Sequence, residues 1–185
     1  MSDEEADRLA LEILVLRAAT HDREAITKLA ERFDAPMRYY IRRLLGRDER
    51  VPDVAQEVWL GVIRQLPRLR NPSSFIPWFY RIARNAAIQQ IRGASRVRLL
   101  ATEDVPEVAV EAEDTFSSED AVAVHQAMDR LSEEHREVLT LRFIEDQSYE
   151  QIASIIGCSV GTVRSRLFYA KRALRGRMEL SHERP

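Results

Sequence analysis

One segment constrains the fold more than any other, and it reads SYEQIASIIGCSVGTVRSRLFYAKRAL over residues 148–174. Ser148 can cap a short helix, Gly157 supplies a residue that turns sharply, and Ser159 can cap a second helix. Together these signals predict a helix-turn-helix unit. The apolar face of its first helix is formed by Ile152, Ala153 and Ile156.

In a helix-turn-helix unit the second helix lies in the DNA major groove and presents residues near its N-terminus to base edges. Val163 and Leu167 are expected to face inward, which leaves Arg164 free to bond a guanine bidentately. The alternative interpretation of this segment is a solvated basic helix that packs on a neighbour. Such a helix would not need the two caps, the turn glycine and both apolar stripes together. The residues predicted to contact duplex DNA are Ser159, Val160, Gly161, Thr162, Arg164, Ser165, Arg166, Tyr169 and Lys171.

Helical spacing of apolar residues continues along most of the chain, and no segment shows the alternation typical of a strand. We therefore predict an all-α protein. Asp22 is expected to cap a helix, and Asp34-Ala35-Pro36 is expected to break the chain before another helix that Gly46 closes. The predicted buried stripes include Leu9, Ile13 and Leu16; Ile26, Leu29 and Phe33; Val54, Val58 and Val62; and Phe75, Trp78, Phe79, Ile82, Ala83 and Ala86.

Charge and proline content divide the chain into two helical lobes. Residues 99–129 contain no Lys or Arg but many acids, and Pro106 interrupts any helical pattern there. We predict a first domain over 1–95, an acidic flexible linker over 96–118, a second domain over 119–178 and a tail over 179–185. The second domain is expected to have its own smaller core, from Val122, His125, Met128, Leu131, Val138, Leu139, Leu141 and Phe143.

Composition indicates a folded protein of a reducing compartment. Hydrophobic residues make up 45% and charged residues 31% of the chain, and the net charge of -2 argues against bulk attraction to nucleic acid. The single Cys158 cannot form an internal disulfide. The acidic N-terminus does not resemble a signal peptide, and no apolar run is long enough to span a bilayer, so we expect a cytoplasmic protein.

No catalytic or metal-binding constellation emerges from the sequence. The four histidines are scattered, without cysteines or paired acids at the spacing of metal ligands. A glycine-rich phosphate loop is also missing. We therefore expect no enzymatic activity, no metal and no cofactor.

Residues 131–174 resemble the C-terminal domain of bacterial RNA polymerase sigma factors, in particular the extracytoplasmic-function (ECF) group. Members read SYEEIA, then a turn, then SVGTVKSRL, and the chain departs from the group at Ser132, where a proline is usual. The N-terminal half supports this independently, because three of its segments resemble, in order, the promoter-melting domain of these factors. They are DREAITKLAERF, DVAQEVWLGVI and FIPWFYRIARN.

The resemblance implies roles for individual residues. Asp53, Gln56 and Glu57 match the pattern that binds the clamp helices of the polymerase largest subunit, and the second domain would contact the flap and read the minus-35 element. The loop after this helix and the next helix would capture unstacked bases of the minus-ten element. The residues implied there are Arg70, Asn71, Ser73, Ser74, Arg81, Arg84, Asn85 and Arg92.

The resemblance also implies an anti-sigma partner, because proteins of this group are commonly held inactive by one that inserts between the two domains. Two other classes of function stay open from the residues alone. A stand-alone helix-turn-helix regulator would bind duplex DNA without polymerase, and a helical interaction protein would have no promoter-dependent activity. The acidic linker suggests a further hypothesis, that it covers a basic DNA-binding surface in the free protein.

Overall fold

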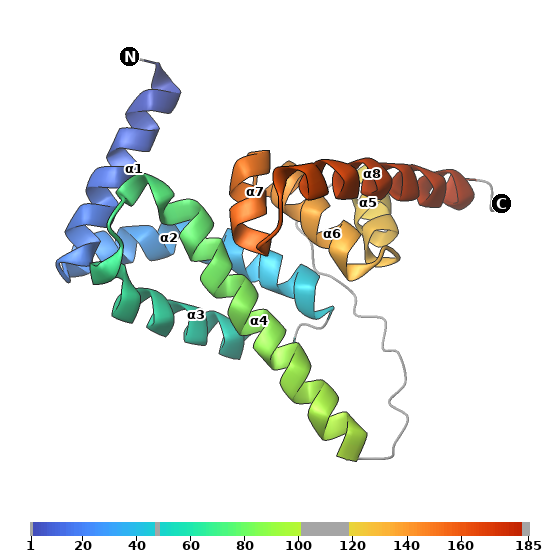
Figure 1. Cartoon of the computed structure of the whole chain (residues 1–185), viewed down its shortest axis with the longest axis horizontal. Coiled ribbons are helices and arrows are strands. Elements are labelled where there is room, and N and C mark those ends of the chain that lie inside the picture. The colour runs from blue at the N-terminus through green and yellow to red at the C-terminus, as the bar shows by residue number, and fades with distance from the viewer. Residues whose placement is uncertain (1, 47–48, 101–118, 183–185) are drawn as a thin grey trace.

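All the regular secondary structure is helical over the residues that the computed structural model describes, 2–46, 49–100 and 119–182, which confirms the predicted fold class (Figure 1). Helices α1 to α4 form an N-terminal lobe and α5 to α8 a C-terminal lobe. The α-helices are α1 (Asp3–Ala19), α2 (Arg23–Leu45), α3 (Val51–Gln65), α4 (Phe75–Leu100), α5 (Glu119–Asp129), α6 (Glu133–Leu139), α7 (Tyr149–Ile156) and α8 (Val160–His182). Short turns of helix cover Leu66–Arg68, Pro72–Ser74 and Thr140–Ile144.

Helix α1 buries a different face from the one that the sequence predicts. The predicted stripe is largely solvent-exposed, with Leu16 56% exposed. Apolar residues occur nearly all around this helix, so their spacing is compatible with burial of either of two faces. Packing against α2 decides which face is buried. The residues that α1 buries are Leu11, Val15 and Ala18.

Helix α2 runs through Pro36 without interruption, so the predicted break before this proline is wrong. A proline inside a helix removes one backbone donor, but here one continuous buried stripe spans both sides of it and stabilises the whole helix. Asp34 does not cap a helix; its carboxylate accepts a hydrogen bond from the Trp59 indole at 2.8 Å. The buried apolar residues of α2 are Ala25, Leu29, Phe33, Met37, Tyr40 and Ile41.

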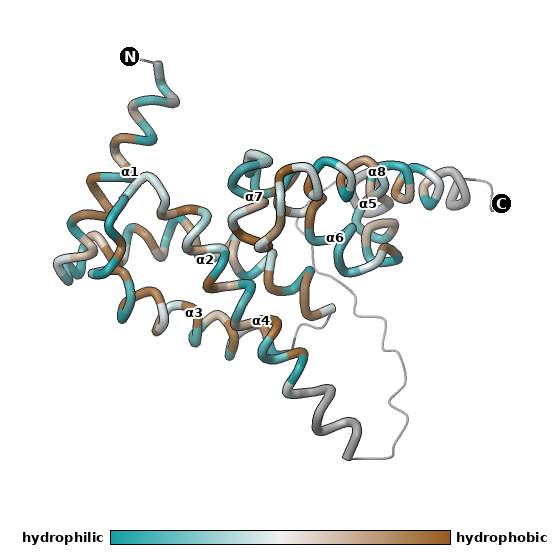
Figure 2. The backbone as a smooth tube through the Cα atoms, viewed as in Figure 1, coloured by the Kyte–Doolittle hydropathy of each residue, from teal (hydrophilic) through white to brown (hydrophobic). Residues whose placement is uncertain are grey.

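The N-terminal lobe is held together by aromatic rings at the meeting point of α2, α3 and α4. Phe79 lies at the centre, with ring centroids 5.4 Å from Phe33, 5.4 Å from Trp59 and 5.6 Å from Phe75. Such offset and tilted contacts are favourable beyond simple burial. In Figure 2, apolar and polar residues alternate around α3 and α4, as expected for helices that each bury one face.

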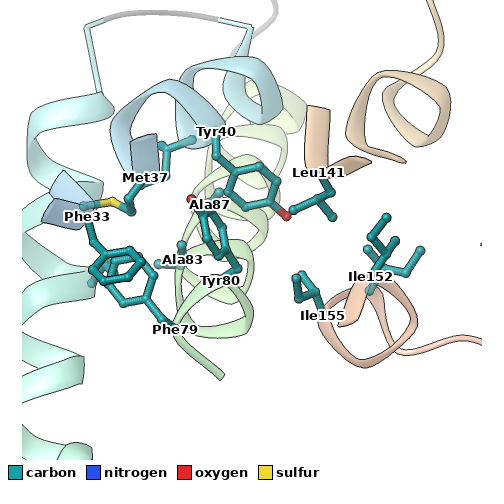
Figure 3. Packing of buried hydrophobic residues seen from close by; sticks show 14 of the residues in the cluster. Phe33, Met37, Tyr40, Phe79, Tyr80, Ala83, Ala87, Leu141, Ile152 and Ile155 are labelled. Carbon is teal, nitrogen blue, oxygen red and sulfur yellow. The ribbon is translucent and has the colours of Figure 1, made fainter. Parts of the chain in front are cut away.

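The two lobes share one apolar cluster, which corrects the expectation of two separate cores. Helix α4 packs against α7, and α2 packs against α6. Figure 3 shows Tyr40 and Tyr80 of the N-terminal lobe facing Leu141, Ile152 and Ile155 of the C-terminal lobe. Phe143, expected in the second core, is instead 57% exposed. The sequence could not indicate this shared core, because each lobe shows its own helical pattern.

Helix α4 continues to Leu100, five residues beyond the predicted end of the first domain at residue 95. Residues 94–100 contain no proline or glycine to stop it. Similarly, α8 extends to His182, into the predicted tail. The acidic stretch 101–118, and with it the hypothesis that the linker covers a basic surface, lies outside the described residues.

Candidate polymerase and nucleic-acid interfaces

Helix α3 presents the three residues predicted to bind polymerase on its outer face. Asp53, Gln56 and Glu57 are all exposed. The opposite face is held in the core by Val54, Val58 and Val62, which the sequence predicted to be buried. Leu60 lies one turn beyond Gln56 and is 53% exposed, so it extends this surface with an apolar side chain. The sequence analysis missed Leu60, although its spacing of three and four residues from Glu57 and Gln56 could have indicated it.

The loop between α3 and α4 is shaped by Asn71. Its side-chain oxygen accepts hydrogen bonds from the Ser73 backbone N–H at 3.1 Å and from the Ser73 hydroxyl at 2.8 Å. This arrangement is an Asx turn, which ends the loop and starts the turn of helix before α4. Arg70, Asn71 and Ser73 are exposed and Ser74 is half-buried.

The four predicted DNA contacts of α4 do not form one exposed row. Arg81, Asn85 and Arg92 are exposed. Arg84 instead points toward the C-terminal lobe, where its Nε lies 2.8 Å from the Glu137 carboxylate. Trp78 is half-buried and packs 5.9 Å from the Phe75 ring, in agreement with the packing role predicted for it.

The helix-turn-helix unit forms as the sequence predicts. The Ser148 hydroxyl accepts a hydrogen bond from the Gln151 N–H at 3.1 Å, and the Gln151 side chain accepts one from the Ser148 N–H at 2.7 Å. This reciprocal pair is a capping box. Gly157 ends α7 in the left-handed region with φ of 72°. Ser159 caps α8 by accepting from the Thr162 N–H at 3.1 Å.

Replacing Ser148 with alanine is expected to lower the free energy of unfolding by about 1 kcal/mol, because the first turn of α7 loses its cap. Urea denaturation followed by circular dichroism measures this loss. Ser154→Ala is the control, since Ser154 is an exposed residue within the same helix. Equal unfolding free energies for the two variants would contradict the capping role.

Helix α8 turns its predicted DNA-reading face outward. Val163 and Leu167 are buried, whereas Gly161, Arg164 and Ser165 are exposed. The half-buried residues of the predicted set are Val160, Thr162 and Arg166, and the exposed ones also include Ser159, Tyr169 and Lys171.

Two of these side chains have protein partners. Arg166 Nη2 lies 3.1 Å from Glu134 of α6. Lys171 Nζ lies 4.9 Å from the centroid of the Phe143 ring. Both side chains are therefore oriented by contacts within the C-terminal lobe.

Polar contacts between the lobes were not anticipated from the sequence, because their partners lie far apart along the chain. Glu137 of α6 is buried and accepts a hydrogen bond from the Tyr40 hydroxyl at 2.9 Å as well as from Arg84. Burial, together with the negative charge of Glu137, raises the pKa of Tyr40 well above its ordinary value, so this hydroxyl remains a donor. Arg43 pairs with Asp129 at 2.5 Å, on the side of α2 that faces α5.

Among residues 2–46, 49–100 and 119–182, no helix is both long enough and apolar enough to cross a bilayer. Within the same ranges, His, Cys, Asp and Glu side chains do not gather in groups of three or more that could hold a metal ion.

Models of two protein families match the chain in consecutive parts. The Sigma-70 region 2 model matches residues 29–97, and the Sigma-70, region 4 model matches residues 121–174. The first match covers α3 and most of α2 and α4, and the second covers the helix-turn-helix unit. The order of the two matches favours a sigma factor over a stand-alone helix-turn-helix regulator, because the N-terminal lobe is matched as well.

Solved structures with this fold include the sigma factor RpoE in complex with the anti-sigma factor NepR from Bartonella quintana. It has a TM-score of 0.75 at 23% identity and covers 85% of this chain and 98% of that chain. The structure of CnrH in complex with the cytosolic domain of CnrY has a TM-score of 0.68 at 23% identity, with 95% and 99% coverage. These likenesses establish the fold.

Curated relatives extend over nearly the whole chain. The ECF RNA polymerase sigma-E factor of Haemophilus influenzae is 31% identical over 186 residues, which is 94% of this chain and 98% of that protein. The protein of the same name from Escherichia coli (strain K12) is 32% identical over 190 residues, with 94% and 97% coverage. With both sigma regions matched in order, the chain belongs to the ECF family of RNA polymerase sigma factors, which direct transcription initiation from promoters.

Proposed function

We propose that this sigma factor divides its work between the two lobes. The N-terminal lobe, residues 1–95, binds core polymerase and opens and reads the minus-ten element. The C-terminal domain, residues 119–178, reads the minus-35 element. Residues 96–118, which begin with the end of α4 and contain the acidic stretch 101–118, connect the two. The observation that carries the proposal is a complete helix-turn-helix unit with the N-terminal face of α8 exposed. Along the chain, this unit follows a lobe that the region 2 model matches.

Polymerase binding is assigned to the outer face of α3. Asp53, Gln56 and Glu57 offer two carboxylates and an amide on a rigid helix, which suits a basic partner surface. The exposed Leu60 beside them supplies apolar area, and a desolvated apolar anchor next to polar groups is a common composition of a binding hot spot. The polymerase performs the bond-forming chemistry, and the sigma factor supplies recognition.

Promoter DNA is assigned to two surfaces. Near the minus-ten element, the loop residues Arg70, Asn71, Ser73 and Ser74 would hold extruded bases, which offsets the few kcal/mol that unstacking each base costs. Arg81, Arg84, Asn85 and Arg92 would follow the backbone along α4. At the minus-35 element, Arg164 would read a guanine, while Arg166, Tyr169 and Lys171 would contact phosphates.

An anti-sigma factor and a flap contact complete the proposed set of partners. Two structures with the same fold are complexes with a second protein. In one the sigma factor RpoE is bound to the anti-sigma factor NepR, and in the other CnrH is bound to the cytosolic domain of CnrY. The exposed Phe143 and Phe168 of the C-terminal lobe provide apolar surface for such a partner. The compartment of action would be the bacterial cytoplasm, where polymerase and promoters meet.

The triple variant Asp53→Ala/Gln56→Ala/Glu57→Ala is expected to lose specific initiation in runoff transcription with core polymerase. Truncating a hot spot costs about 2 kcal/mol or more, so binding to core should weaken roughly thirtyfold or more. Glu31→Ala, which removes an exposed acid from α2, is the control and should behave like the wild-type protein. Initiation by the triple variant at the wild-type level would contradict the assignment of α3.

A further inference from the structure

The minus-ten loop, defined here as residues 69–74, uses three of its backbone N–H groups internally. The Ser73 N–H donates to the Asn71 side-chain oxygen at 3.1 Å, and the Ser74 N–H donates to the Asn71 carbonyl at 3.1 Å. The Leu69 N–H donates to the Leu66 carbonyl at 3.0 Å. Because each N–H group has one hydrogen, these three are not available to a base or a phosphate. Recognition by this part of the chain therefore depends on side chains.

One atom, the side-chain oxygen of Asn71, fixes the direction of the Ser73 hydroxyl. It accepts both the Ser73 backbone N–H and the Ser73 hydroxyl, the latter at 2.8 Å. Because a backbone N–H can only donate, its partner must be the oxygen of the amide and not the nitrogen. The hydroxyl therefore donates its single hydrogen to this oxygen, and only its lone pairs are left for a ligand. Ser73 is exposed, so it presents a hydrogen-bond acceptor to the outside.

The fold holds this pair of side chains in place before any DNA arrives. Asn71 precedes Pro72 and has an extended backbone, with φ of -121° and ψ of 107°, which is the conformation that a following proline favours. The short turns of helix at Leu66–Arg68 and Pro72–Ser74 both pack against α1 (Figure 1). A recognition group held in this way loses little freedom on binding, which strengthens its discrimination between ligands.

Bases differ in what they offer to an acceptor. Cytosine and adenine carry an exocyclic amino group, which donates, whereas thymine carries a carbonyl oxygen at the corresponding position. An acceptor that meets this carbonyl leaves two oxygens facing each other without a hydrogen, and unpaired polar groups of this kind reduce affinity.

We infer that Ser73 determines base specificity in the minus-ten loop. Its hydroxyl accepts a hydrogen bond from the exocyclic amino group of an extruded cytosine or adenine, and it disfavours thymine. Asn71 is a positioning residue, because it acts by orienting the Ser73 hydroxyl. The inference deepens the proposed function and rests on it, since it takes this loop to hold an extruded base.

The test uses holoenzyme assembled from core polymerase and the full-length protein. The probe is a fluorescein-labelled promoter from which the wild-type protein initiates, with the non-template strand of the minus-ten element left unpaired. Each unpaired position carries deoxycytidine or deoxyuridine in turn, because these differ in an amino group against a carbonyl on the same ring. Anisotropy gives the two affinities at fixed salt, since phosphate contacts depend strongly on it. At one position we expect deoxycytidine to bind roughly tenfold more tightly, the usual effect of losing a hydrogen bond and leaving its partner unpaired.

Four variants connect this preference to the two side chains. Ser73→Ala removes the acceptor, and Asn71→Ala releases the hydroxyl hydrogen, so either variant should bind the two probes equally. Asn71→Asp keeps the oxygen that orients Ser73 and should retain the preference, although its charge weakens binding to both probes. Arg70→Ala is the matched control in the same loop. A phosphate contact carries no sequence information, so this variant should lower both affinities and leave their ratio unchanged.

Two results would refute the role of Ser73. One is equal binding of deoxycytidine and deoxyuridine at every unpaired position by the wild-type holoenzyme, and the other is an unchanged preference in Ser73→Ala. Runoff transcription by the wild-type protein separates this failure from that of the proposed function. Normal initiation together with either result rejects only the role of Ser73. Failure of the wild-type protein to support initiation from any promoter would reject the proposed function itself.

Discussion

Replacing Phe79 with alanine is expected to lower the free energy of unfolding by about 3–5 kcal/mol, the usual cost of removing a fully buried phenylalanine. Phe79 is 0% exposed and contacts the rings of Phe33, Trp59 and Phe75, so no neighbour can fill the cavity without giving up its own packing. Because small proteins are stable by only about 5–15 kcal/mol, this change removes much of the total. Urea denaturation followed by circular dichroism measures it.

Leu16→Ala is the control for this prediction. Leu16 is 56% exposed on α1, and truncation of such a residue should change the unfolding free energy by no more than about 0.5 kcal/mol. A loss of 2 kcal/mol or more at Leu16 would show that the predicted stripe of α1 is buried after all. A small loss at Phe79 would contradict the described aromatic core.

The stability of the protein is expected to fall as pH rises from about 4.5 to 7, through the titration of Glu145. Burial raises the pKa of Glu145 from an ordinary value of 4.5 to about 7, although the hydrogen bond from Tyr80 opposes this shift. One carboxylate oxygen of Glu145 is buried without a hydrogen-bond partner among the described residues, which explains why the charged form is disfavoured.

The direction of this change in stability with pH follows from the number of protons that the folded and unfolded states bind. Between pH 4.5 and 7 the folded protein holds a proton on Glu145 that the unfolded chain has released, so raising the pH favours unfolding. Below pH 4.5 Glu145 is protonated in both the folded and the unfolded state. Above pH 7 the loss of unfolding free energy is complete. The difference in pKa corresponds to about 3 kcal/mol at most, since 1.36 kcal/mol accompanies each pKa unit.

Glu145→Gln isolates this contribution, because glutamine stays neutral and keeps an oxygen for the Tyr80 hydroxyl. Urea denaturation of both proteins at several pH values between 4 and 8 gives the comparison. The variant should be about as stable as the wild-type protein near pH 4.5 and more stable near pH 8. Parallel curves for the two proteins would show that Glu145 does not titrate in this window.

Local signals in the sequence predicted the helix-turn-helix unit correctly. Ser148, Gly157 and Ser159 each act within a few residues of their own position, as a cap, a left-handed turn and a second cap. Such interactions depend little on the rest of the fold. The exposed face of α3 could be anticipated for a similar reason, because its buried valines recur at a helical interval along one helix.

Long-range packing decided what the sequence left ambiguous. Helix α1 has two apolar faces that could be buried, and contact with α2 selected the face that carries Leu11 and Val15. In α2 a buried stripe on both sides of Pro36 outweighed the tendency of proline to end a helix.

By itself, the sequence determined the all-α class, the helix-turn-helix unit and the family, because these depend on local spacing and on motifs that can be read along the chain. Only the tertiary structure decided that the two lobes share one core and that Arg84 pairs with Glu137, 53 residues away. Pairing across such a distance leaves no periodic trace in the sequence. It depends instead on the balance of apolar burial and charge pairing between surfaces that are formed only once both lobes have folded.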